Sequence, residues 1–195
     1  MVSKEPIASL LPNFVFWNPD ELARQILLER GFAGFAGVPP DQLHFAFITA
    51  ADATIVNLKN CISQGTPCGV ETVLSTDKYK ELVNLVLASS GIFGLLYVGL
   101  RSPGIACQRV ARRVREKGHD VPNDKIIARW SRSLVNLPWF AARASQFWIV
   151  DNSDEDPDAT GKSIAEGNSG SIRWHDANAI PELSAALQPL PVCQV

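Results

Sequence analysis

The chain has 195 residues, of which 46% are hydrophobic and 19% charged, so it can bury a sizeable core and is not a disordered protein. Its formal net charge of -2 argues against a general nucleic-acid binder, because such proteins are usually basic. No apolar run approaches the roughly 18 residues that a membrane-spanning helix needs. We therefore expect neither a nucleic-acid partner nor a membrane partner.

The N-terminal sequence and the cysteines indicate a cellular location. The start, M-V-S-K-E-P-I-A, lacks the long apolar core of a signal peptide. The four cysteines show no C-x-x-C motif and no metal-ligand spacing with the three histidines; they are Cys61, Cys68, Cys107 and Cys193. We expect a soluble protein of the reducing cytoplasm, with no metal site built from cysteine and histidine.

Short apolar strands alternate with helices along the first 150 residues. Strands are predicted at 13–17, 68–74, 93–100 and 146–150. Helices are predicted from Pro19 to about 30, at 40–64, 78–89 and 103–116, and from near Asn123 onward. This alternation predicts parallel βαβ units in a three-layer α/β sandwich with a mostly parallel sheet. Ligands of such sheets sit at the carboxyl ends of the strands, where five residues would collect: Asp20, Glu71, Thr72, Arg101 and Asp151.

Local signals mark several helix ends. Pro19 suits the first position of a helix, and the two acids that follow it suit the positive N-terminal end. Gly65 predicts the end of the long helix at 40–64. Ser75-Thr76-Asp77 is predicted to cap the next helix with a side chain.

The C-terminal part departs from the strand–helix alternation. Residues 164–174 predict a small β-hairpin, and residues 176–195 predict a short helix and a proline-rich end. We therefore assign 1–175 to one domain and 176–195 to a tail. Gly161-Lys162-Ser163 ends like a P-loop, but position 156 is Asp instead of Gly and a hairpin follows. The sequence contains no G-x-x-x-x-G-K-[ST] motif.

Two consecutive predicted helices are rich in arginine. Six arginines belong to them: Arg109, Arg112, Arg113, Arg115, Arg129 and Arg132. A turn with Gly118, His119 and Pro122 joins the two helices. The guanidinium group offers a fork of donors that suits phosphate oxygens, so the pair could form the closing lid of a phosphoryl-transfer enzyme. The alternative is a solvated helical hairpin that salt bridges stabilise.

The order of these segments resembles one known family. Along the chain come N-P-D-E after the first strand, G-V-E-T-V-L-S after the second, L-R-S-P and R-V-A-R-R-V, then G-H-D-V-P, R-W-S-R-S-L-V-N-L and V-D-N-S. Over about residues 13–175 they resemble the zeta-toxin-like P-loop kinases. The resemblance implies a P-loop NTPase-like fold and a kinase that uses ATP and Mg²⁺ to phosphorylate a small molecule. In zeta toxins proper this acceptor is a UDP-activated amino sugar, and an antitoxin is the partner.

The resemblance also implies roles for individual residues. Asp20 matches the catalytic base that accepts the proton of the substrate hydroxyl, and Glu71 and Thr72 match the pair that binds the substrate. Arg109 and Arg113 match the catalytic arginines of the first lid helix, and Arg129 and Arg132 match the ATP-binding second lid helix. No residue matches a metal ligand.

Each of these roles has a structural alternative. Asp20 could be an ordinary carboxylate at a helix N-terminus, and Glu71 with Thr72 an ordinary strand end. His119 is predicted to stabilise the turn and not to take part in catalysis.

The sequence departs from the family at its start. Family members carry a strand and a P-loop ahead of the N-P-D-E segment, and that strand lies in the middle of the sheet. We therefore expect the chain to be an inactive or incomplete kinase as written. A start site placed too late, a decayed kinase gene, or a scaffold that only binds a nucleotide, another anion or a partner would each explain the departure. A plain structural α/β domain is a further alternative.

Overall fold

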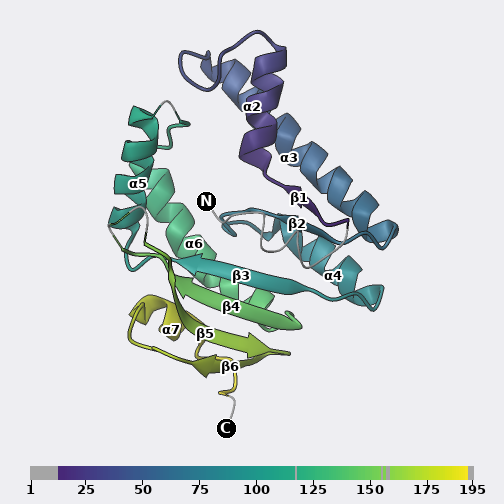
Figure 1. The fold of residues 1–195 in the computed structure, drawn as a ribbon, viewed down its shortest axis with the longest axis vertical. Coiled ribbons are helices and arrows are strands. Elements are labelled where there is room, and N and C mark those ends of the chain that lie inside the picture. The colour runs from purple at the N-terminus through teal and green to yellow at the C-terminus, as the bar shows by residue number, and fades with distance from the viewer. Residues whose placement is uncertain (1–12, 117, 155, 157–158, 193–195) are drawn as a thin grey trace. The chain divides into compact units, whose positions relative to one another are not determined.

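The computed structural model describes residues 13–116, 118–154, 156 and 159–192 (Figure 1). Its helices are α2 (Pro19–Glu29), α3 (Pro40–Ser63), α4 (Lys80–Ala88), α5 (Pro103–Arg115), α6 (Asn123–Ala141) and α7 (Pro181–Leu187), and a 3-10 turn, η1 (Asp77–Tyr79), precedes α4. Its strands are β1 (Val15–Trp17), β2 (Cys68–Val70), β3 (Gly94–Gly99), β4 (Gln146–Asp151), β5 (Lys162–Asn168) and β6 (Ser171–Trp174). The chain forms two compact units. The first contains the described residues up to Thr72 and Arg112–Asp120, and the second contains the remaining described residues.

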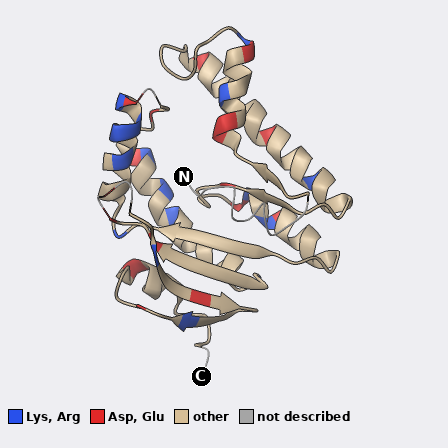
Figure 2. Cartoon of the chain, viewed as in Figure 1, with Lys and Arg blue, Asp and Glu red and all other residues tan. Residues whose placement is uncertain are grey.

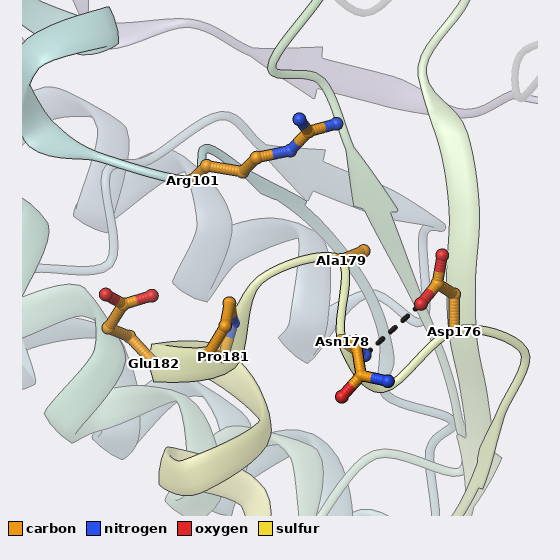
Figure 3. A pocket seen from close by; sticks show the side chains of 6 residues that line it. All are labelled: Arg101, Asp176, Asn178, Ala179, Pro181 and Glu182. Atoms are coloured by element: carbon orange, nitrogen blue, oxygen red, sulfur yellow. Dashed lines mark hydrogen bonds between the residues drawn. The ribbon is translucent and has the colours of Figure 1, made fainter.

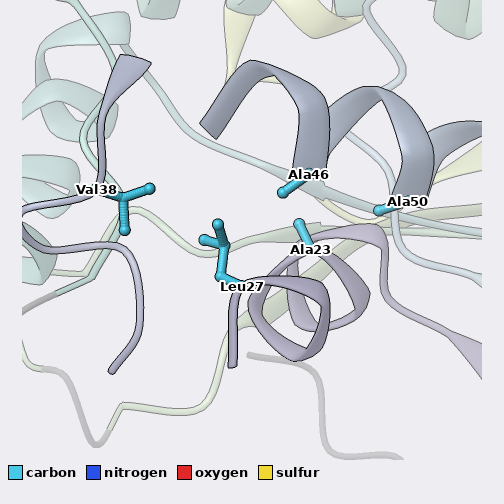
Figure 4. Packing of buried hydrophobic residues seen from close by; sticks show 5 residues of the cluster. All are labelled: Ala23, Leu27, Val38, Ala46 and Ala50. Carbon is cyan, nitrogen blue, oxygen red and sulfur yellow. The ribbon is translucent and has the colours of Figure 1, made fainter. Parts of the chain in front are cut away.

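The first unit consists of a parallel strand pair and a helical crossover. β1 pairs with β2 in parallel, with Val15 opposite Cys68. The crossover contains α2 and α3. The buried residues of their contact are three alanines and one leucine: Ala23 and Leu27 from α2, and Ala46 and Ala50 from α3 (Figure 4). All four side chains are fully buried. Alanine has almost no side chain beyond Cβ, so the two helix backbones can approach closely while Leu27 fills the space between them.

The second unit is built on a four-stranded sheet in the order β3-β4-β5-β6. β3 and β4 are parallel, whereas β4–β5 and β5–β6 are antiparallel. Phe147 and Ile149 of β4 are fully buried, as are Leu183 and Leu187 of α7. A side chain at Gly167 would overlap the Phe147 ring and the backbone of Ser171, so this position of β5 requires glycine.

Most of the predicted elements are present. The strands predicted at 13–17, 68–74, 93–100 and 146–150 correspond to β1 to β4, and the predicted hairpin is β5–β6. The α/β class and the parallel strand pairs are confirmed. None of the helices in the described ranges combines the length and the apolar character needed to cross a membrane.

Two features of the prediction were wrong. The described strands form two sheets instead of one mostly parallel sheet, because no described strand pairs with both β2 and β3 and because β5 and β6 join in antiparallel. The second strand ends at Val70 and not at Leu74, whose positive φ of 58° is incompatible with an extended strand.

The side-chain cap predicted for Ser75-Thr76-Asp77 is not observed at the N-cap positions of this segment, Thr76 and Tyr79. Thr76 makes no capping hydrogen bond, and the segment begins instead with the 3-10 turn η1. An ion pair of 2.7 Å between Lys80 Nζ and Asp77 Oδ1 spans this start. The segment therefore begins without the side-chain acceptor that the sequence pattern suggests.

The contact between α2 and α3 gives a first prediction. Replacing the fully buried Leu27 by Ala should lower the free energy of unfolding by about 3 kcal/mol, because it removes apolar contacts and leaves a cavity. The adjacent Leu28, which is 42% exposed, is the matched control, and Leu28→Ala should cost less than about 1 kcal/mol. Urea unfolding measures both values, and similar losses in the two variants would contradict the packing described.

A side-chain hydrogen bond between Tyr97 of β3 and Ser133 of α6 gives a second prediction. The Tyr97 hydroxyl lies 3.0 Å from Ser133 Oγ, and Ser133 Oγ donates to the Trp130 carbonyl at 2.8 Å. Tyr97 is therefore the donor to Ser133. Burial raises the pKa of Tyr97, while the hydrogen bond to Ser133 lowers it. The net effect is upward, so the folded protein keeps this proton to a higher pH than the unfolded chain does.

The stability that comes from the Tyr97 proton is fully present below about pH 10 and is lost as the pH rises above that value. Tyr97→Phe removes this titration. We expect the free energy of unfolding of the variant to fall less steeply above about pH 10 than that of the parent chain. Urea unfolding across this pH range measures the two slopes, and parallel curves would contradict the assignment.

Candidate functional site

Two of the predicted site residues, Asp20 and Glu71, follow the carboxyl ends of β1 and β2, and Asn18 contacts both. Asn18 follows β1, and its Nδ2 donates to Glu71 Oε2 at 3.0 Å. The Oδ1 of the same Asn18 accepts from the backbone N–H groups of Asp20 at 2.9 Å and Glu21 at 3.2 Å. One amide side chain therefore caps α2 and also holds the carboxylate that follows β2.

The carboxylates at this edge differ in their partners. Glu21 forms an ion pair of 2.7 Å with Arg24 one turn further along α2. Asp20 is exposed, and its carboxylate has no hydrogen-bond or ion-pair partner among the described residues. Thr72 is exposed and directly follows Glu71. The first unit thus presents Asp20, Glu71 and Thr72 at the end of its parallel strand pair, which is where α/β sheets bind ligands.

Sequence reasoning did not include Asn18 among the site residues. Its position before Pro19 is the signal for a helix N-cap, and the capping function could have been predicted from it. The bond to Glu71 could not, because it joins positions 53 residues apart. The indole Nε1 of Trp17, the last residue of β1, is buried and has no hydrogen-bond partner among the described residues. This indole N–H is therefore a second polar group at the end of β1, besides Asn18, that the sequence-based list of site residues lacks.

In the second unit, Arg101 and Asp151 meet at the carboxyl ends of β3 and β4. Arg101 Nε and Nη2 donate to Asp151 Oδ2 at 3.2 and 3.1 Å. The backbone N–H and the hydroxyl of Ser153 donate to the other carboxylate oxygen, Oδ1. Asp151 is therefore fully satisfied although its side chain is only 4% exposed, whereas the Arg101 side chain is 63% exposed.

A shallow pocket of about 470 Å³ lies beside Arg101 (Figure 3). Its other lining residues are Asp176, Asn178, Ala179, Pro181 and Glu182. Lys162 Nζ lies 2.9 Å from Asp176 Oδ2, and this hydrogen bond lowers the pKa of the Asp176 carboxyl. The pocket thus combines one guanidinium with two carboxylates, so it offers no uniformly positive surface to a phosphate.

The two arginines predicted to be catalytic both donate to backbone carbonyls. Arg109 Nη2 donates to the Asp154 carbonyl at 3.0 Å, in the second unit. Arg113 Nε and Nη2 donate to the His119 carbonyl at 3.2 and 2.9 Å, in the first unit. The His119 ring packs 4.4 Å from the Phe47 ring, centroid to centroid. Arg113 and His119 together therefore hold the turn after α5, as the sequence predicted for His119.

The arginines of α6 differ from those of α5. Arg129 and Arg132 share one face of the helix with Lys125, because the three are spaced by four and three residues. Figure 2 draws all Lys and Arg residues of the described chain in blue. This face adjoins the buried one, which contains Ile126 and Leu137. None of the three cations has a hydrogen-bond or ion-pair partner among the described residues, so no salt bridge of the predicted hairpin is observed on this helix, whereas a solvated face agrees with the structure. We call Lys125, Arg129 and Arg132 the basic face of α6.

Within the described part of the chain, no cluster of three or more His, Cys, Asp or Glu side chains could hold a metal ion. Comparisons with known proteins do not indicate a function for the chain. No family model matches the chain, and no curated protein or solved structure matches it. A functional assignment therefore depends on the geometry of the site together with the sequence resemblance.

The double role of Asn18 gives a third prediction. Asn18→Ala removes both the cap of α2 and the bond to Glu71, and it should lower the free energy of unfolding by about 1–2 kcal/mol. Asn18→Ser is the matched control, because serine is an equally good cap but its hydroxyl is too short to replace the amide donor. We expect most of the loss to be recovered in the serine variant. Chemical denaturation measures the free energy of unfolding of both variants. Equal losses in the two would contradict the assignment of capping as the larger of the two contributions of Asn18 to stability.

Proposed function

We propose that this chain is a small-molecule kinase domain of the zeta-toxin type. In this proposal Asp20, Glu71 and Thr72 hold the hydroxyl-bearing acceptor, and Arg129 and Arg132 contact the phosphates of ATP, as the resemblance implies. The observation that carries the proposal is the double contact of Asn18, which bonds to the Glu71 carboxylate at 3.0 Å and to the Asp20 backbone N–H at 2.9 Å, so that both residues lie at the same end of a parallel strand pair. The motif order over residues 13–175 supports it independently.

The surroundings of the two neighbouring acids favour Asp20 as the base. A general base must be within hydrogen-bond reach of the hydroxyl that it deprotonates, so its carboxylate has to be available. Asp20 is exposed and its carboxylate has no partner among the described residues, whereas the Glu21 carboxylate is paired with Arg24. Glu71 is held by Asn18, which suits a residue that orients the acceptor.

The described residues fit ATP only in part. When bound, ATP would supply the phosphoryl group and Mg²⁺ would neutralise its charge. The basic face of α6 offers guanidinium groups that can contact phosphate oxygens. However, Lys162 lies in the antiparallel strand β5 and pairs with Asp176, so it does not form a phosphate cradle. No three-ligand metal cluster is required, since Mg²⁺ in kinases is usually held by one or two carboxylates and the phosphates.

The absence of a G-x-x-x-x-G-K-[ST] motif from the sequence favours a second candidate function, a scaffold that binds a nucleotide or another anion without catalysis. Such a scaffold needs the basic face of α6 but makes no use of Asp20. The two candidates therefore differ in what Asp20 does.

A fourth prediction follows for the protein as its gene encodes it, with any coding sequence upstream of Met1 retained. We expect MgATP binding, measured by calorimetry, to weaken by about tenfold or more when Arg129 and Arg132 are both replaced by Ala. Asp20→Asn should leave that affinity unchanged but lower phosphoryl transfer to a UDP-activated amino sugar by about 10²–10⁴-fold, because the base is lost. Phosphorylated product is measured by mass spectrometry.

Glu21→Gln is the matched control, because it changes the neighbouring carboxylate, which is already paired with Arg24. It should retain both ATP binding and phosphoryl transfer. Tight binding of MgATP without any transfer to the amino sugar would favour the non-catalytic scaffold. No binding of MgATP at all would overturn the kinase proposal.

A further inference from the structure

Two cysteines lie on either side of the turn that connects α3 to β2. α3 is followed by Gly65 in the left-handed conformation, with φ 65°, and the Gly65 N–H donates to the Ile62 carbonyl at 3.1 Å. The next N–H, that of Thr66, donates to the Cys61 carbonyl at 2.9 Å. This pair of bonds is the Schellman motif, which reverses the chain immediately after the helix. The chain therefore changes direction at Gly65, three residues before Cys68.

The start of β2 is held next to this turn. Val15 of β1 donates its N–H to the Pro67 carbonyl at 3.0 Å, and Cys68 is the first residue of β2, opposite Val15. Three effects raise the pKa of the Cys68 thiol to about 11. Burial is the largest, and a charge interaction and a side-chain hydrogen bond, both with Cys61, follow. The Schellman turn and the pairing of β1 with β2 thus place Cys61 and Cys68 on either side of one short turn. Both side chains are half-buried, which leaves them accessible to a small reagent.

We propose that Cys61 and Cys68 form a dithiol pair that closes to a disulfide by exchange with a low-molecular-weight disulfide such as oxidised glutathione. In the first step the Cys61 thiolate attacks one sulfur of the reagent, whose disulfide bond breaks and releases one reduced glutathione. In the second step the Cys68 sulfur attacks the Cys61 sulfur and releases the second glutathione. Two protein thiols are oxidised, one disulfide is reduced to two thiols, and both protons pass to the released glutathione.

The order of the two steps follows from the surroundings of Cys68. Only the thiolate attacks a disulfide, and a pKa of about 11 leaves very little Cys68 thiolate near neutral pH. Cys61 is therefore the first nucleophile, and Cys68 resolves the mixed disulfide. Burial is the largest cause of the raised pKa and persists after Cys61 has reacted, so the closing step remains slow and accelerates as the pH rises.

The bond would connect the last turn of α3 directly to the first residue of β2, three positions before Glu71. It would close the short loop of residues 61–68 across the Schellman turn. This inference does not depend on the proposed function, because it concerns only the thiols and the turn between them.

The fifth prediction tests this pair in the full chain with Cys107 and Cys193 both replaced by Ser, so that Cys61 and Cys68 are the only thiols. The chain is equilibrated in glutathione redox buffers, under native conditions and in concentrated urea, and the oxidised fraction is measured by alkylation and mass spectrometry. We expect the equilibrium constant for disulfide formation to be about tenfold or more higher in the folded chain, because the fold holds the sulfurs together. Closure should also accelerate by about tenfold per pH unit between roughly pH 7 and 9.

Cys61→Ser in the same background is the control for closure, and it should give at most a single glutathione adduct on Cys68. Peptide mapping of the parent chain checks that the same two cysteines pair when all four are present. A disulfide that forms no more readily in the folded chain than in urea would overturn the proposal. So would a folded chain, with native circular dichroism, that accumulates glutathione on Cys61 without closing.

Discussion

The parallel pairing of β1 with β2 is the constraint on which the candidate site depends. Each strand has only three residues, so their hydrogen bonds alone cannot stabilise the pair. Parallel strands also require a long crossover, which here contains α2 and α3. The close contact of Ala23 and Leu27 with α3 therefore stabilises the register of the strands, and the register in turn brings Asn18 and Glu71 to 3.0 Å. A loss of helix packing would separate two polar side chains that themselves contribute little to the core.

The sequence predicted the elements better than their pairing. Apolar periodicity and the positions of proline and glycine locate the helices well; α3, for example, was predicted at 40–64 and is observed at Pro40–Ser63. The length of β2 could not be predicted in the same way, because a strand extends only as far as its partner does and β1 ends at Trp17. Membership in one sheet or two is likewise a property of distant segments, which a local pattern does not contain.

The partners of single arginine side chains are likewise not predictable from a local sequence pattern. In the sequence, Arg113 and Arg129 are equivalent cations on consecutive helices. In the structure, Arg113 donates to the His119 carbonyl, whereas Arg129 has no described partner. Every residue has a backbone carbonyl, so an acceptor of this kind leaves no trace in the sequence. Cationic residues that serve the fold and cationic residues that remain available to a ligand can be distinguished only after the backbone is placed.

A phosphoryl-transfer site must orient the acceptor, neutralise the phosphates and fix the transferred group in line between its two oxygens. Carboxylates such as Asp20 and Glu71 suit the first task, and guanidinium groups such as Arg129 suit the second. The third task is one of positioning, because little covalent chemistry remains for the protein to do. Side chains on a helix face can neutralise charge, but backbone N–H groups in a tight loop define the position of a phosphate more rigidly. In the proposed kinase, the described carboxylates and guanidinium groups would therefore serve binding, and a phosphate cradle would supply the positioning that catalysis needs.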